Sequence, residues 1–480
     1  MQEPTRAIKN SQLTAHANDS IMIKVVLQSV GTSLSAVFLG FLYSVLIARM
    51  LGPEARGIVA TLVMFATLIA GLSQLGLAQG YVYHKRKSQA SGKYSSETIA
   101  SGKALIIKSI CLVLVASSVL GATTFYWFMP YEVTHYLICW ALLTFIMSLH
   151  LYLQNSSHID ASLSHYNIGR LAIPIINISV IAIIFLYQGV SVVSVIVASI
   201  IAYTVASLLL AKPLLNAENK QTANTHEHNR LANNNPLLTL ASIRRYSASI
   251  YGTSITGILI QCADKIVLLI VGSMTDFGIY AVAYGLSRLV GIIPDTISTY
   301  LFAAFAGTEE KQAANHTNKV FSLLFLPLIA IGACISILAP TLIPAIFGHS
   351  YSLAVIPFIF LLFECIFSSM SWLLAQRFNA EGRPGLVLIR QLISLIPLLA
   401  ALVIMTLGVD YFNAIFDSTI ANNIIQSPLY LLCIAMLASA LLRLLITLAM
   451  YHWALDEKLP RMLPEIRDII TLKHYVLNRT

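Results

Sequence analysis

Long apolar runs recur along the whole chain, and charged residues gather in the segments between them. Runs such as 104–128 and 321–339 are apolar nearly all round and do not alternate with polar positions. A membrane β-barrel would show alternating segments of about ten residues. A transmembrane helix instead needs about 20 apolar residues, and it satisfies its own backbone hydrogen bonds in lipid. We therefore predict an all-α integral membrane protein of about 12 transmembrane helices. The predicted spans are 25–48, 57–82, 104–128, 133–155, 170–187, 190–211, 246–271, 278–304, 318–340, 352–376, 386–408 and 427–451.

The composition agrees with a membrane protein and argues against several other classes. Of the 480 residues, 57% are hydrophobic and 11% are charged, whereas soluble domains carry roughly 25% charged residues. The net charge of +9 could indicate nucleic-acid binding, but basic loops retained on the inner side of a membrane explain it better. The six cysteines lie in apolar segments without a CxxC pair, so we predict no zinc site and no disulfide framework.

No motif of an enzyme or primary pump is visible. The sequence contains no nucleotide-binding loop, no HExxH, no GxSxG and no pair of carboxylates spaced for hydrolysis. We therefore expect a protein that is not an enzyme and needs no cofactor, metal or nucleic-acid partner. His226 and His228 form an HxH pair, but no further ligand is near, and we interpret them as part of a solvated linker.

The loop charges predict the orientation of the chain in the membrane. The loops after spans two, six and ten carry an excess of Lys and Arg. The opposite set carries mainly Asp and Glu, with Arg49 and Arg56 as its bases. Because Lys and Arg are retained in cytoplasmic loops, both termini are predicted to be cytoplasmic.

A polar segment at 212–245 divides the spans into two groups of six. Residues 57–60 (GIVA) resemble 278–281 (GIYA) at an offset of 221, and a second pair of blocks aligns Arg170 with Arg390 at an offset of 220. These matches predict two six-helix halves around a central cavity, in which a transporter of this kind binds its substrate. The predicted organisation is a cytoplasmic N-terminal segment (1–24), an N-terminal half (25–211), a cytoplasmic linker (212–245), a C-terminal half (246–451) and a cytoplasmic interfacial tail (452–480).

Charged residues inside the spans are the candidates for function, and they lie mainly in the second half. On translocon scales each costs about 2.5–3.5 kcal/mol at a helix centre, so such residues usually face a wet cavity or a partner. Asp264 and Arg288 lie at similar predicted depths and could pair across their helices, either as a structural lock or beside a cationic lining. Such a lining would attract a pyrophosphate, because arginine binds phosphate oxygens in a fork. The candidates for the lining are Lys265, Arg288 and Arg443, and the candidates for coupling or charge pairing are Asp264, Glu364 and Asp295.

Other charges have more than one interpretation. Glu364 has no basic neighbour in its own span, so it could take up a proton for coupling or be a neutral, hydrogen-bonded carboxyl. Arg443 lies roughly mid-span, but a shift of its helix would bring it nearer the interface. Arg377 and Arg390 lie near the predicted inner ends of their spans, where contact with lipid phosphates is expected. Arg49 is expected to be an anchor or a rim contact on the outer side.

Several short motifs resemble bacterial Wzx-type polysaccharide flippases of the MATE/MOP superfamily. These motifs are 48–57 (ARMLGPEARG), 76–80 (GLAQG), 263–265 (ADK), 278–284 (GIYAVAY) and 381–384 (EGRP). The resemblance implies a multi-pass flippase in the bacterial inner membrane that moves an undecaprenyl-pyrophosphate-linked oligosaccharide for O-antigen, capsule or exopolysaccharide synthesis. It also implies contact with membrane lipids, a polysaccharide polymerase and chain-length proteins.

Two other functions remain open from the sequence. A cation-coupled multidrug exporter of the same superfamily should use Asp264 or Glu364 for coupling, but this chain has no acid within its first span, where several such exporters carry one. A non-transporting scaffold of a glycan assembly complex would not need a charged cavity. Lipid II flippases usually carry two further spans after the twelve expected here.

Overall fold

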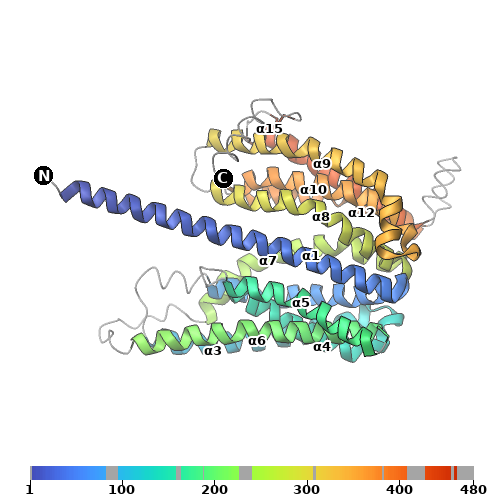
Figure 1. The fold of residues 1–480 in the computed structure, drawn as a ribbon, viewed down its shortest axis with the longest axis horizontal. Coiled ribbons are helices and arrows are strands. Elements are labelled where there is room, and N and C mark those ends of the chain that lie inside the picture. The colour runs from blue at the N-terminus through green and yellow to red at the C-terminus, as the bar shows by residue number, and fades with distance from the viewer. Residues whose placement is uncertain are drawn as a thin grey trace. The chain divides into compact units, whose positions relative to one another are not determined.

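The computed structural model describes residues 3–82, 96–157, 164–187, 189–225, 240–305, 310–380, 383–407, 427–455 and 459–461 (Figure 1). Within these ranges the chain is helical and contains no strand. The long helices are α1 (Glu3–Ser73), α3 (Ser96–Phe128), α4 (Leu137–Ser156), α5 (Ser164–Tyr187), α6 (Val192–Thr225), α7 (Leu240–Val271), α8 (Met274–Phe305), α9 (Glu310–Phe347), α10 (Val355–Ala380), α11 (Pro384–Ile393), α12 (Ile396–Leu407) and α15 (Pro428–Leu455). The short helices η1 (Tyr131–Tyr136) and η3 (His349–Ala354) precede α4 and α10.

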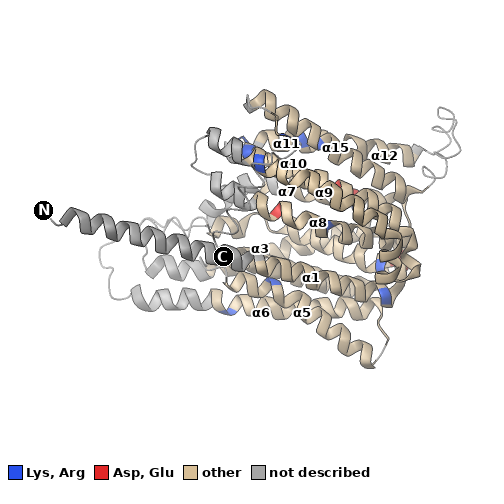
Figure 2. Cartoon of the chain, turned by 45° about the horizontal axis from the view of Figure 1, so that its top comes forward, with Lys and Arg blue, Asp and Glu red and all other residues tan. Residues whose placement is uncertain are grey.

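Ten helical segments in the described part of the chain are long and apolar enough to cross a membrane. The first, Gly31–Ser73, contains two predicted spans, because α1 bends at Gly52 directly before Pro53. Gly52 has φ 75° and ψ 176°, a conformation that glycine adopts without a steric penalty. With α7 as the seventh span, the prediction of an all-α membrane protein with about 12 transmembrane helices is confirmed. Most of each helix carries no charged residue (Figure 2).

The chain divides into two compact units. Unit 1 comprises Met1–Tyr43 and Thr61–Leu259, and unit 2 comprises Ser44–Ala60 and Ile260–Thr480. The predicted halves differ from these units in two segments, since 44–60 groups with unit 2 and 246–259 groups with unit 1. The two six-helix halves stay a prediction. Helix α6 continues to Thr225 and α7 begins at Leu240, so both enter the segment predicted as a linker. His226, His228 and most of the predicted tail lie outside the described residues.

Unit 1 contains α3, α4, α5 and α6, which run alongside one another (Figure 1). Its helices pack through an apolar cluster that includes Tyr81, Tyr152 and Leu210. Buried polar groups join the helices as well. The indole of Trp140 donates to the carbonyl of Leu62 at 3.2 Å, which satisfies a donor that would be costly to leave unpaired in the bilayer.

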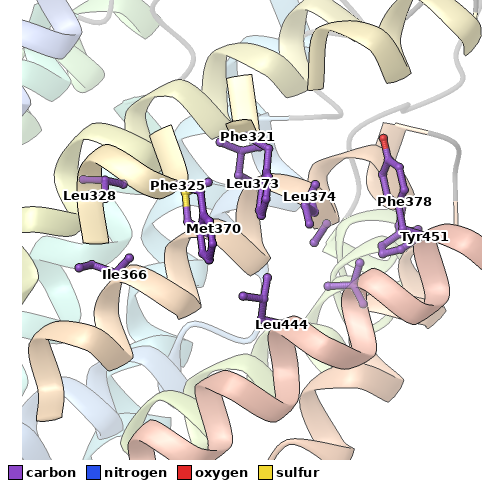
Figure 3. Close-up of a cluster of buried hydrophobic side chains, with 12 residues drawn as sticks. Phe321, Phe325, Leu328, Ile366, Met370, Leu373, Leu374, Phe378, Leu444 and Tyr451 are labelled. Atoms are coloured by element: carbon purple, nitrogen blue, oxygen red, sulfur yellow. The ribbon is translucent and has the colours of Figure 1, made fainter. Parts of the chain in front are cut away.

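Unit 2 contains α8, α9, α10 and α15 around a second apolar cluster (Figure 3). Phe321 and Phe325 of α9 stack with ring centroids 5.1 Å apart and an interplanar angle of 15°. Leu373 of α10 and Leu444 of α15 belong to the same cluster. Dispersion contacts of this kind hold membrane helices together, since lipid tails are as apolar as the side chains. The cluster therefore fixes α10 between α9 and α15.

The start of α8 crosses the start of the second span at a pair of glycines in unit 2. A Cβ added to Gly57 would lie 1.8 Å from the carbonyl oxygen of Met274, and a Cβ added to Gly278 would lie 1.8 Å from that of Pro53. Both pairs are related by the offset of 221 found in the sequence. Reciprocal contacts of this kind are typical of elements related by a two-fold axis. Only glycine permits so close an approach of the two backbones.

The eleventh span is broken rather than continuous. Helix α11 ends at Ile393 and α12 begins at Ile396. Pro397 has no N–H to donate to the carbonyl of Ile393, so the helical hydrogen-bond ladder is interrupted at this point. The hydroxyl of Ser439 on α15 donates to the carbonyl of Ser394 at the break. The predicted span 386–408 is therefore confirmed as one membrane-crossing segment, Gly385–Thr406, which is made of two helices.

Candidate functional site

The carboxylate of Asp264 on α7 is the centre of a buried polar group in unit 2. The Nζ atom of Lys265 lies 3.3 Å from Oδ2 of Asp264, and the hydroxyl of Tyr280 on α8 donates to the same oxygen. Lys265 also donates to the carbonyl of Gln261 at 3.2 Å. Asp264 is 3% exposed, so these donors replace the water that its carboxylate has lost. Asp264 therefore holds Lys265 in place.

The ring of Tyr284 on α8 contacts two cations. The Nζ atom of Lys265 lies 4.1 Å from its centroid, and Cζ of Arg288 lies 4.2 Å from it. An aromatic face attracts cations at such distances, more strongly where water is excluded. Tyr284 thus joins the charged group of α7 to that of α8.

Arg288 pairs with Glu364 of α10, with Nη2 and Oε2 2.5 Å apart. Glu364 is 3% exposed. The pair forms because α8 and α10 pack closely at Gly291, where an added Cβ would lie 2.7 Å from Sγ of Cys365. Asp264 and Arg288, which the sequence suggested could pair with each other, instead pair with Lys265 and Glu364. Matching depths along two helices did not fix which faces of the helices meet.

Arg443 of α15 lies at the break in the eleventh span. Its Nε donates to the hydroxyl of Ser394, and its Nη1 donates to the hydroxyl of Ser368 on α10, both at 3.1 Å. These bonds place the guanidinium between α10 and the junction of α11 and α12. The prediction that Arg443 is an interior residue therefore agrees with its contacts, whereas its role with substrate stays a prediction.

Arg390 of α11 is buried in the same region, with 1% of its surface exposed. Its Nη1 donates to the carbonyl and hydroxyl oxygens of Ser371 at 3.1 and 2.6 Å, and to the hydroxyl of Thr447 at 2.9 Å. Ser371 and Thr447 also bond to each other at 2.8 Å. Hydroxyl and carbonyl groups of α10 and α15 therefore substitute for the lipid phosphates that were expected to contact this residue.

One face of α10 thus holds three arginines from three different helices. Residues 364, 368 and 371 are spaced four and three positions apart, so they lie on one side of the helix. At about 1.5 Å per residue the stripe spans about 10 Å along α10. The contacts are Glu364 with Arg288, Ser368 with Arg443, and Ser371 with Arg390.

The cations of this region differ in whether a carboxylate forms an ion pair with them. Lys265 and Arg288 of α7 and α8 are paired with Asp264 and Glu364, and Asp295 of α8, which bonds to Ser369, adds a third carboxylate. In contrast, no carboxylate in the described ranges forms an ion pair with the two arginines of α11 and α15. The positive charge predicted for α7 and α8 is therefore locally neutralised. Arg390 and Arg443 have no ion-pair partner in the described chain, and Glu364 acts favourably on Arg443 from a greater distance.

The structure shows the surroundings of the three arginines that were predicted at the rim or in contact with lipid. Arg49 is exposed and its Nε donates to the carbonyl of Ile346 at 2.6 Å, while its Nη2 donates to that of Ala345. It therefore caps the end of α9. Arg377 is 3% exposed and, like Arg390, is buried within unit 2. The expectation of lipid contact is wrong for these two residues.

The sequence interpretation missed the residues that hold the charges. Tyr280, Tyr284, Ser368, Ser371 and Thr447 are neutral and lie in apolar helices. One signal was available, since a polar stripe at positions 364, 368 and 371 of an otherwise apolar span predicts a buried polar contact. The partners on other helices left no comparable signal.

Comparisons with known proteins agree with this architecture. A family described as polysaccharide biosynthesis protein matches residues 46–356. Among solved structures, a mutant of the MATE transporter VcmN of Vibrio cholerae has a TM-score of 0.61 at 14% identity, covering 92% of this chain and 98% of its own. The lipid II flippase MurJ, in an inward closed conformation, has a TM-score of 0.59 at 14% identity, covering 94% and 91%. Identities this low show the fold alone. No curated protein sequence matches the chain.

Proposed function

This chain belongs to the polysaccharide biosynthesis protein family, and we propose that it is a flippase for lipid-linked oligosaccharides. In this proposal it moves an undecaprenyl-pyrophosphate-linked oligosaccharide from the cytoplasmic to the periplasmic leaflet of the bacterial inner membrane. The transported glycan would serve O-antigen, capsule or exopolysaccharide synthesis. Both termini would be cytoplasmic, as the loop charges predict.

The observation that supports the proposal most strongly is the set of three arginines on one face of α10. A charged side chain in the middle of a span is costly, so such residues usually serve a substrate, an ion or a partner. A guanidinium binds phosphate oxygens through two parallel hydrogen bonds, and its charge persists at any physiological pH. An anionic diphosphate is therefore the head group that this region suits best.

The fold offers a way of moving such a head group. Transporters built from repeated bundles bind substrate near the middle of the membrane and expose it to each side in turn. We infer that Lys265, Arg288 and Arg443 face the head group during this alternation. The polyprenyl tail would stay in the lipid, where it needs no protein cavity. A polysaccharide polymerase and chain-length proteins would act on the exported product.

Deletion of the gene tests this proposal. In a strain without a second copy, we expect surface polysaccharide to be lost and lipid-linked oligosaccharide to accumulate on the cytoplasmic leaflet. Complementation with the wild-type gene should restore both. Normal surface polysaccharide in the deletion strain would contradict the proposal.

A second candidate function, a cation-coupled multidrug exporter, is favoured by the buried carboxylates of Asp264 and Glu364. Each is 3% exposed and lies beside a cation, as expected of a group that exchanges partners during transport. An exporter would confer resistance to cationic drugs when overexpressed, and Asp264→Asn or Glu364→Gln would abolish that resistance. A flippase would leave drug sensitivity unchanged.

A further inference from the structure

We propose that Arg390 and Arg443 form the binding site for the phosphate groups of the substrate, at the break between α11 and α12. This inference rests on the proposed function and names the part of unit 2 that recognises the head group. It assigns a role in binding to Arg390. Among the cations proposed to face the head group, it places the main phosphate contacts at Arg443 together with Arg390, rather than at Lys265 and Arg288.

Arg390 is held rigidly with part of its hydrogen-bonding capacity unused. Three acceptors from Ser371 and Thr447 take up Nη1 alone. Its Nε is buried and has no hydrogen-bond partner among the described residues. A buried N–H donor without an acceptor carries a free-energy penalty. An oxygen of a bound phosphate would satisfy this donor.

Arg443 of α15 lies at the same junction of α11 and α12. Its Nε donates to the hydroxyl of Ser394, which orients the side chain. The hydroxyl of Ser439 donates to the carbonyl of Ser394. The carbonyl is therefore satisfied and does not compete for the arginine. Helix α12 begins two residues later, at Ile396. Ser394 thus positions Arg443 at the junction of α11 and α12.

The charges of the two arginines match a diphosphate. The charge of Arg443 acts unfavourably on that of Arg390. Neither arginine forms an ion pair with a carboxylate of the described chain, and only Arg443 is also acted on favourably by Glu364. A pyrophosphate linked at both ends, to a lipid and to a sugar, carries one negative charge on each phosphate. Binding it between the two guanidiniums would neutralise both charges. The α7–α8 cluster also has an unpartnered buried Nε, at Arg288, but its cations already have carboxylate partners and gain less from an anion.

Binding of a short prenyl diphosphate to the purified full-length protein tests this site. Isothermal titration calorimetry would compare geranyl diphosphate with geraniol, which has the same tail but no phosphates. We expect the wild type to bind geranyl diphosphate and to bind geraniol much more weakly. Arg390→Gln and Arg443→Gln should each weaken geranyl diphosphate binding by about tenfold or more, since each removes charged hydrogen bonds.

Arg383→Gln is the matched control, because Arg383 is an exposed arginine of unit 2 whose Nη1 donates to the carbonyl of Ala454. It should leave binding unchanged. If Arg390→Gln does not fold, Arg390→Lys replaces it, because lysine keeps the positive charge but lacks the two parallel N–H groups of a guanidinium. Arg390→Lys should weaken binding less than Arg443→Gln does. Wild-type affinity in folded Arg390→Gln and Arg443→Gln, or equal binding of geraniol and geranyl diphosphate, would overturn the site.

The outcomes separate the site from the function. Arginine-dependent binding in a protein whose deletion leaves surface polysaccharide normal would keep the anion site and reject the flippase. Loss of polysaccharide on deletion, with full complementation by Arg390→Gln and Arg443→Gln, would keep the flippase and reject the site.

Discussion

Nη2 of Arg288 on α8 lies 2.5 Å from Oε2 of Glu364 on α10, although the two residues are 76 positions apart in the sequence. The arginine side chain is 31% exposed, whereas the glutamate side chain is 4% exposed. The buried carboxylate therefore needs the ion pair to compensate for its lost hydration, whereas the arginine is partly exposed. Loss of the arginine should thus leave Glu364 as an unpaired buried charge.

Removing the arginine alone should destabilise the protein more than removing both charges. Arg288→Met leaves a buried carboxylate without its partner, which costs about 3–5 kcal/mol for fully buried pairs and about 1–3 kcal/mol here because the arginine is partly exposed. The double variant Arg288→Met/Glu364→Gln removes the unpaired charge and should recover much of this loss. Thermal unfolding of the purified variants in detergent measures the difference. A double variant less stable than Arg288→Met would contradict the pairing.

Tyr284 should stabilise unit 2 through its aromatic face. Tyr284→Leu removes the contacts with Lys265 and Arg288 and should cost about 1–2 kcal/mol. Tyr284→Phe keeps the ring and serves as the matched control, so it should unfold near the wild-type temperature. Equal losses in the two variants would show that the hydroxyl, and not the ring, provides the stabilisation.

The glycine crossing should tolerate no side chain on either partner. Gly57→Ala and Gly278→Ala each place a methyl group 1.8 Å from a backbone carbonyl oxygen, which flexible side chains cannot relieve. Each should cost more than about 3 kcal/mol, beyond the usual cost of overpacking. Gly285→Ala is the control, because an added Cβ there meets nothing within 4 Å and alanine favours helix. Wild-type stability in both crossing variants would refute the close approach.

The break in the eleventh span should depend on Pro397. Pro397→Leu restores an N–H that can bond to the carbonyl of Ile393, and we expect α11 and α12 to become one helix. Amide hydrogen exchange around 394–398 should slow, and complementation of surface polysaccharide should fall because Ser394 no longer holds Arg443. Unchanged exchange would show that contacts with α15, such as that of Ser439, keep the break by themselves.

The sequence predicted the spans well because lipid imposes a simple rule on them. Any run of about 20 apolar residues can cross the bilayer as a helix, and the described helices follow those runs. The turn at Gly52–Pro53 and the paired positions Gly57 and Gly278 also left direct signals in the sequence. The break at Ser394 was missed, although Pro397 pointed to it.

The partners of the charged residues could not be predicted in the same way. A sequence gives the depth of a residue in a span but not the direction in which its side chain points around the bundle. Glu364 met Arg288 because α8 and α10 pack closely at Gly291, and Arg390 was buried because α10 and α15 supply hydroxyl acceptors. Both outcomes depend on tertiary packing between distant helices.

Translocation by the purified protein tests the central claim most directly. Lipid-linked oligosaccharide extracted from the deletion strain would be incorporated into proteoliposomes, and its exposure on each leaflet would be followed over time. We predict that wild-type protein and Arg383→Gln move the lipid between leaflets, whereas Arg390→Gln and Arg443→Gln move it at least about tenfold more slowly. Translocation no faster with wild-type protein than in protein-free liposomes would contradict the proposed function.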